Sequence, residues 1–159
     1  MVWMHLRDGR SIGRTTRLAP GQPVRVDFTA DPLERMEGEM LHITAVTNEG
    51  TPIPKARLTV VGRRFEQGGK PALVFVREET ADREGALDLH VPYGVYDILA
   101  MNARDGQSGT VSRLVVNQQI AEVQALKIEL RGTFTRDELA AQRDKLLDRA
   151  ETMLYVWTQ

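Results

Sequence analysis

The stretch that decides the fold is residues 86–103, which read ALDLHVPYGVYDILAMNA. Apolar and polar residues alternate over 87–91, residues 95–103 form a short and mostly apolar run, and Pro92-Tyr93-Gly94 separates the two. Alternation with a period of two is typical of a strand that has one buried face, and Pro and Gly mark a turn. The stretch therefore predicts two antiparallel strands joined by a tight turn.

The same pattern continues on both sides of this stretch. Turns such as Asn48-Glu49-Gly50 and Asp105-Gly106 punctuate it. The predicted strands are Met40–Thr47, Ala56–Arg63, Leu73–Glu79, Ala86–Val91, Val95–Ala103, Thr110–Asn117 and Val123–Leu130. Short alternating strands at this spacing predict an all-β fold, a Greek-key antiparallel β-sandwich.

Two segments carry a family resemblance. The first is NEGTPIPKARLTV (48–60), and the second is TADREGAL (80–87) followed by VPYGVY (91–96). Together they resemble the carboxypeptidase regulatory-like family of the transthyretin-like (prealbumin-like) sandwiches, with departures at Ala81, an extra residue, and at Leu87, where that family prefers an aromatic. The resemblance implies a sandwich that binds or supports rather than catalyses, and it implies no particular ligand.

The glycines and the tyrosine of these segments have structural explanations. Gly50, Gly85 and Gly94 suit tight turns or a left-handed backbone. Tyr96 is expected to bury its ring and to leave its hydroxyl at the rim of the sandwich.

The N-terminal part, residues 1–35, is predicted to be a β extension of the sandwich at residues 36–131. Asp8-Gly9 lies between two alternating runs and predicts a β-hairpin. A further strand is expected where Val24, Val26 and Phe28 alternate with charged residues.

The C-terminal part, residues 132–159, is predicted to hold one long amphipathic helix over 135–157. Thr135 and Glu138 have the spacing of a capping box. The apolar stripe has one charge in it, Arg143, which needs a carboxylate partner or a position at the rim. The helix packs either on its own sandwich or on another subunit. For the second case, the candidate partner-binding residues are Leu139, Leu146, Leu147, Met153, Leu154, Tyr155 and Trp157.

Composition and motifs bear on the chemistry. The net charge is −1 and there is no cysteine, so neither a nucleic-acid partner nor a thiolate site is expected. His5, His42 and His90 lack the spacing of a metal site. Nucleophile-elbow, P-loop and dinucleotide motifs do not occur. We therefore expect no catalytic, cofactor or metal site and no enzyme; no apolar run is long enough to predict a membrane partner.

The function that these features favour is that of a structural subunit in a larger assembly. Its partners would be other protein subunits, in a homo- or hetero-oligomer. A phage or phage-like particle (head, neck, tail or decoration component) is the expected assembly, because similar sandwiches resemble parts of such particles. The N-terminus does not read as a signal peptide, so synthesis in the cytoplasm is expected. The alternative is a carbohydrate- or ligand-binding accessory module with contacts from loops 64–72 and 104–109.

Overall fold

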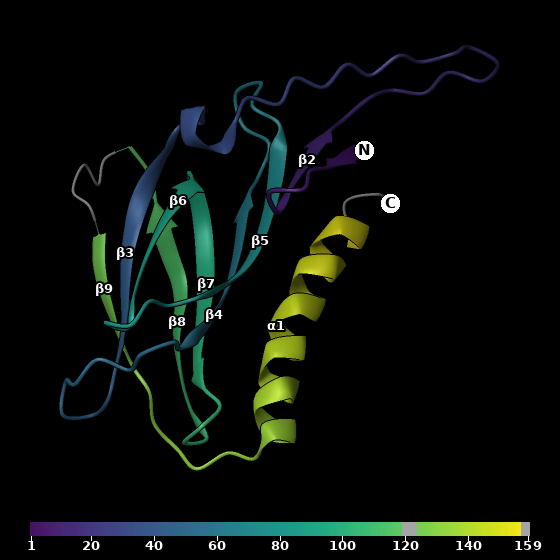
Figure 1. Cartoon of the computed structure of the whole chain (residues 1–159). Coiled ribbons are helices and arrows are strands. Elements are labelled where there is room, and N and C mark those ends of the chain that lie inside the picture. The colour runs from purple at the N-terminus through teal and green to yellow at the C-terminus, as the bar shows by residue number, and fades with distance from the viewer. Residues whose placement is uncertain (119–123, 157–159) are drawn as a thin grey trace.

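The computed structural model describes residues 1–118 and 124–156, and it consists of two facing sheets and one helix (Figure 1). The elements are β1 (Val2–His5), β2 (Arg10–Arg14), the 3-10 turn η1 (Leu33–Arg35), β3 (Gly38–Val46), β4 (Arg57–Arg64), β5 (Ala72–Thr80), β6 (Ala86–Pro92), β7 (Gly94–Asn102), β8 (Gln107–Val116), β9 (Gln124–Glu129) and α1 (Arg136–Val156). The predicted all-β sandwich with a single C-terminal helix is confirmed.

The larger sheet has the strand order β1-β2-β5-β4-β7-β8, and the smaller one has the order β6-β3-β9. Neighbouring strands pair antiparallel as predicted, with one exception among the described residues: β9 runs parallel to β3. Parallel pairing requires a crossover rather than a hairpin. It arises here because the chain leaves β8 in one sheet and joins β3 in the other.

The core between the sheets is built around Tyr96, whose side chain is fully buried and meets Phe75 edge to face at 6.0 Å between ring centroids. The Tyr96 hydroxyl donates a hydrogen bond to the Pro92 carbonyl at 2.5 Å. The expectation of a rim position for this hydroxyl is therefore wrong. The Pro92-Tyr93-Gly94 turn supplies an acceptor inside the sandwich, so the group can be buried without losing its hydrogen bond.

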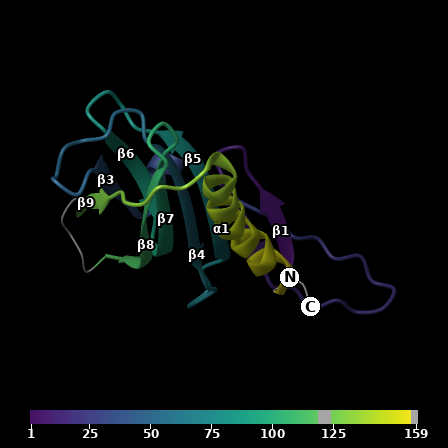
Figure 2. The same ribbon diagram turned by 90° about the horizontal axis from the view of Figure 1, so that it is seen from below.

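The N-terminal hairpin forms as predicted, with Gly9 in the left-handed region at φ +91°. It is the edge of the larger sheet rather than a separate appendage, because β2 pairs with β5. The expected strand at Val24–Phe28 is wrong. Residues 15–32 form no regular element beyond a turn and extend away from the two sheets (Figures 1 and 2). Alternation alone makes no strand where no neighbour pairs with the backbone.

The helix α1 lies against the outer face of the larger sheet, over β4, β5 and β7 (Figures 1 and 2). Its capping box is confirmed: the Thr135 N–H donates to Glu138 Oε2 at 2.7 Å, and the Glu138 N–H donates to Thr135 Oγ1 at 3.2 Å. A second apolar cluster joins the helix to the sheet, with Leu139, Leu146 and Ala150 against Val61, Val74, Leu99 and Met101. Of the two alternatives for the helix, the structure shows packing on its own sandwich.

Candidate interaction site at the N-terminal arm

The segment that stands apart from the body of the molecule is residues 15–31, which we call the arm. It leaves the sheet after β2 and returns to η1 (Figure 1). Leu18 is 78% exposed and Val24 is 41% exposed, whereas Val26 and Phe28 are half-buried. The arm thus presents apolar side chains and an extended backbone away from the two sheets.

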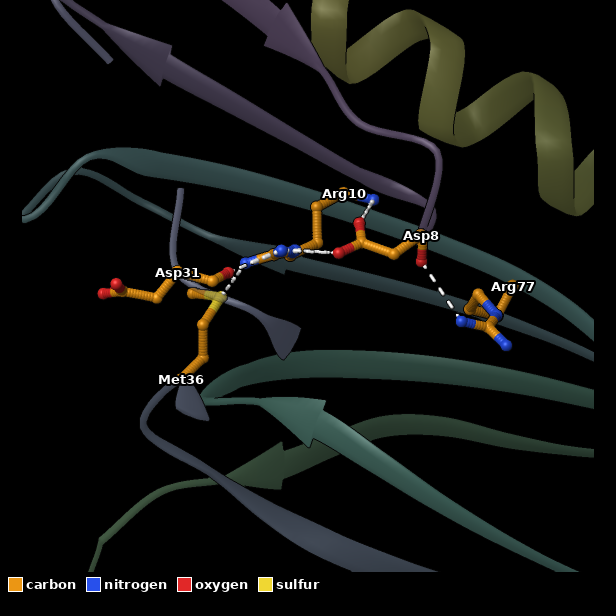
Figure 3. A network of polar contacts seen from close by, with 5 residues as sticks. All are labelled: Asp8, Arg10, Asp31, Met36 and Arg77. Carbon is orange, nitrogen blue, oxygen red and sulfur yellow. Dashed lines mark hydrogen bonds and ion pairs between the residues drawn. The ribbon is translucent and has the colours of Figure 1, made fainter. Parts of the chain in front are cut away.

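The end of the arm that returns to the body is held by Arg10, a charged residue that is only 3% exposed (Figure 3). We call Arg10 and its contacts with Asp8, Asp31 and Met36 the root of the arm. Its guanidinium donates to Asp8 Oδ2 at 2.8 Å from Nε and at 2.5 Å from Nη2. Nη2 also donates to the Asp31 carbonyl at 2.8 Å, and Nη1 contacts the Met36 sulfur. One buried side chain therefore connects the β1–β2 hairpin to both the end of the arm and the residue after η1.

The electrostatics of this root favour an ionised Asp8. Burial alone would raise the pKa of the Asp8 carboxyl, but the hydrogen bonds and charge of Arg10, with a contribution from Arg77, lower it below its usual value. Arg77 Nη1 also donates to the Asp8 carbonyl at 3.3 Å. Both guanidinium nitrogens donate to one oxygen, Oδ2, while Oδ1 accepts from the Arg10 backbone N–H, so Asp8 holds the Arg10 side chain in place by three charge-assisted hydrogen bonds.

The outgoing end of the arm has its own attachment to the body. The Thr15 hydroxyl donates to Glu66 Oε2 at 2.8 Å, which connects the arm to the β4–β5 loop. Within the arm, the exposed Arg25 and Asp27 pair at 2.8 Å. The arm is therefore fixed near both ends and exposes its middle.

The helix residues predicted to bind a partner mostly face the chain's own sheet. The members of the helix–sheet cluster are Leu139, Leu146, Leu147, Met153 and Leu154. Tyr155 is 73% exposed, and Trp157 lies outside the described residues. Of the two alternatives expected for Arg143, a carboxylate partner or a position at the rim, the structure shows the partner: Nη2 donates to Glu78 Oε2 at 3.1 Å. Of this set, Tyr155 is the described residue left on the surface, and its partner-binding role stays a prediction.

Sequence reasoning missed the Arg10 network, although one signal for it was present. Arg10 alternates with Ile12 in β2 and therefore occupies an inward-facing position of the hairpin. A charge at such a position implies a buried partner, because an unpaired buried charge is very costly. Asp8, two residues earlier, is that partner.

The histidines have ordinary hydrogen-bond partners. His5 lies 2.7 Å from the Ser11 hydroxyl, His42 pairs with Asp88, and His90 lies 3.2 Å from the Met36 carbonyl. Over residues 1–118 and 124–156, no group of three or more His, Asp or Glu side chains could hold a metal ion. In the same part of the chain, no helix has both the length and the apolar character needed to cross a membrane.

Comparisons with known proteins assign no family. No family model matches the chain, and no curated protein matches it. Among solved structures, it is similar to a 9R-lipoxygenase from Cyanothece PCC8801, with a TM-score of 0.34 and 10% identity. The match covers 74% of this chain and 18% of the lipoxygenase chain, so this chain spans less than a fifth of that protein. The carboxypeptidase regulatory-like resemblance stays a prediction.

The prediction that this chain is no enzyme is contradicted by that comparison, because the matched structure is an enzyme, and we withdraw it. The prediction was based on missing sequence motifs, and motifs do not capture catalytic groups that only the fold brings together. The same likeness is too distant to support any particular activity, so the correction goes no further and we assign no reaction to this chain.

Proposed function

We propose that this protein is a structural subunit of a larger protein assembly and that it docks through its arm. The observation that carries the proposal is the arm itself: residues 15–31 extend from the body, are attached near both ends and carry a strand-type pattern in their middle. Exposed apolar side chains such as Leu18 and Val24 favour an interaction surface, because a partner that covers them removes apolar area from water.

Strand addition is the docking mode that suits the arm. Val24, Val26 and Phe28 alternate with Arg25 and Asp27, so an extended conformation places the apolar and charged side chains on opposite faces. In the described structure the arm pairs with no strand. In strand addition, main-chain hydrogen bonds supply affinity and alternate side chains supply specificity.

The partner that we propose for the arm is a second copy of the chain. Each copy offers edges of the larger sheet along β1 and along the part of β8 beyond Ser108, whose backbone already pairs with Arg131. The arm leaves the larger sheet on the β1–β2 side. An arm that pairs with the β8 edge of the next copy forms a head-to-tail interface. Such interfaces generate rings where the rotation closes and filaments where it does not.

A phage or phage-like particle is the assembly that we propose for such a subunit. This part of the proposal is supported by the resemblance of residues 48–60 and 80–96 to sandwich modules found in particles of that kind. Closed rings and open stacks are also the forms that a head-to-tail interface produces.

The experiment that tests the arm is a mass measurement by light scattering over protein concentrations from about 10 μM to about 1 mM, the range of modest affinities. The full chain is compared with the double variant V26S/F28S and with the control R25S/D27S, which changes the opposite face of the same segment. We expect the full chain and the control to associate, and V26S/F28S to stay monomeric. A monomeric full chain at the highest concentration, or equal association of both variants, would refute docking by the arm.

A further inference from the structure

A cavity of about 370 Å³ lies at the root of the arm, next to the Arg10 network. Its walls come from β2, the β4–β5 region and the segment from Thr29 to Glu37. Two carboxylate residues line it, Asp31 and Glu37. Five cationic residues line it: Arg10, Arg14, Arg35, Arg64 and Lys70. The cavity therefore has an excess of positive charge in a protein whose net charge is −1.

The strand register explains why three of these guanidinium groups share one side of the sheet. Arg10 and Arg14 lie at alternate positions of β2, on the same face as Ile12 between them. Ile12 is paired with Leu73 of β5, and Leu73 is paired with Arg64 of β4. The pairing thus places Arg64 on that same face, two strands away from β2. Arg35 lies on the opposite wall of the cavity, where it is the exposed last residue of η1.

Only two of the five cations have a carboxylate partner in the described part of the chain. Arg10 pairs with Asp8, and Lys70 pairs with Glu37 at 2.6 Å. Arg14, Arg35 and Arg64 make no ion pair with any described residue. These three charges are available to a ligand.

The second observation is that two of these charges have buried, unsatisfied donors. The Nε atoms of Arg14 and Arg64 are shielded from solvent, and neither has a hydrogen-bond partner among the described residues. Burial lowers the pKa of the Arg64 guanidinium, and the nearby Tyr96 and Glu37 offset only part of that effect. Donors of a charged group are among the most costly to bury without an acceptor, so each such group in a native protein requires an explanation.

We propose that this cavity binds an oxyanion, a phosphate or carboxylate group, between the guanidinium groups of Arg14 and Arg64, with Arg35 at the mouth. Guanidinium forks match the oxygen geometry of both groups and form charge-assisted hydrogen bonds with them. The negative charge of the bound group would compensate the guanidinium charges of Arg14 and Arg64, which have no carboxylate partner among the described residues. Because Thr29, Ala30 and Asp31 line the same cavity, an occupied site also fixes the end of the arm and extends the proposed function.

The test is binding of inorganic phosphate to the full chain, measured by calorimetry and by thermal unfolding in phosphate and in chloride at equal ionic strength. The variants are R14Q and R64Q, with R83Q as the matched control, since Arg83 is exposed on the β5–β6 turn and lines no part of this cavity. We expect saturable binding to the wild type, with a Kd on the order of 1 mM or tighter. Binding should weaken at least tenfold in R14Q and R64Q and stay unchanged in R83Q.

A second readout protects the test from variants that merely unfold. In chloride, R64Q should be at least as stable as the wild type, because the change removes a half-buried charge that has no carboxylate partner among the described residues and a shielded Nε donor that has no acceptor. In phosphate, the wild type should be more stable than R64Q, because only the wild type keeps both arginines of the site. Phosphate that stabilises wild type, R64Q and R83Q to the same extent, or that shows no saturable binding, would overturn the site.

Two sources of the oxyanion are separated by the association state. If the oxyanion is a free phosphate or small carboxylate, it binds the monomer and leaves the molar mass measured by light scattering unchanged. A carboxylate side chain from a second copy competes with phosphate, so added phosphate lowers the association measured by light scattering. Either result supports the oxyanion site. The arm variant V26S/F28S keeps all three arginines, so phosphate binding to it reports on this site even where docking by the arm fails.

Discussion

At the residue scale, the packing of Tyr96 makes the most stringent demand on the sequence. A Cβ at Gly62 would lie 2.1 Å from Tyr96 Cε1, far inside van der Waals contact, and the ring has no exposed surface toward which it could move. Gly62 has no positive φ, so backbone strain is not involved. The glycine is there because a tyrosine ring occupies the space of its missing side chain.

We therefore expect Gly62→Ala to lower the free energy of unfolding by about 1–3 kcal/mol, the usual cost of overpacking. Urea denaturation measures it. The double variant G62A/Y96L provides the control, because leucine vacates the space of the ring edge. The double variant should lose less stability than the sum of the two single changes. Strict additivity would show that the ring is not what excludes the methyl group.

Asp8 gives the second prediction at this scale, which concerns pH. Its folded-state pKa is lowered, because the interactions with Arg10 and Arg77 outweigh the effect of burial. A lowered carboxyl pKa contributes stability that is fully present above the unfolded value of 3.8 and is lost as the pH falls through the folded value.

Stability measured by urea denaturation between pH 7 and pH 2.5 should therefore fall less steeply in Asp8→Asn than in the wild type at the acid end. The control is Asp27→Asn, because its exposed pair with Arg25 is worth about 0–1 kcal/mol. If the free energy of unfolding falls equally steeply with decreasing pH in the wild type and in D8N, the proposed interaction of Asp8 with Arg10 and Arg77 is contradicted.

The sequence could predict some residue roles and not others, for a physical reason. Gly9 and Arg143 were explained by requirements that the local sequence already imposes: a left-handed turn and a charge within an apolar stripe. Tyr96 was misplaced because its acceptor, the Pro92 carbonyl, becomes available only through the conformation of the intervening turn. The convergence of Arg14 and Arg64 depends on register across an intervening strand, which no local pattern contains.

At the scale of elements, the N-terminus of α1 depends on the capping box. Both reciprocal hydrogen bonds are present, so Thr135→Ala should lower the free energy of unfolding by about 1 kcal/mol. Thr152→Ala is a matched control in the same helix, where the threonine hydroxyl donates to the Asp148 carbonyl and caps nothing. Alanine is the better helix former there, so T152A should not destabilise. Urea unfolding followed by circular dichroism distinguishes the two, and equal effects would rule out the capping role.

The contrast between α1 and the segment 24–28 shows which elements a sequence can specify. The hydrogen bonds and caps of a helix lie within the segment, so the predicted range 135–157 closely matches Arg136–Val156. A strand needs a neighbour, and the alternation at 24–28 has none within residues 1–118 and 124–156. The parallel pairing of β9 with β3 was also beyond local patterns, since both pairing modes suit the same alternation.

At the scale of the whole molecule, the three segments that the sequence suggested are joined into one packed body. The N-terminal hairpin pairs with β5, and the helix packs on β4, β5 and β7. Trp3 of the hairpin packs against the cluster that holds the helix. The hairpin, sheet and helix therefore share contacts, and a chain with shared contacts is expected to unfold as one unit.

This arrangement gives the last prediction, for which Trp3 is the natural probe. The chain has two tryptophans, so Trp157→Phe leaves Trp3 as the sole one. The Trp3 ring covers Gly13, where a Cβ would lie 2.8 Å from it, and its fluorescence therefore reports on the hairpin in its packed state. We expect the fluorescence transition in urea to coincide with the transition seen by far-ultraviolet circular dichroism, which reports on the sheets and the helix.

If residues 1–35 were an independent extension, the fluorescence midpoint would come at a lower urea concentration, because a two-stranded hairpin alone is only marginally stable. Coincident midpoints in W157F would show that the hairpin at the base of the arm shares the stability of the whole sandwich, as its contacts with β5 and with the helix–sheet cluster predict.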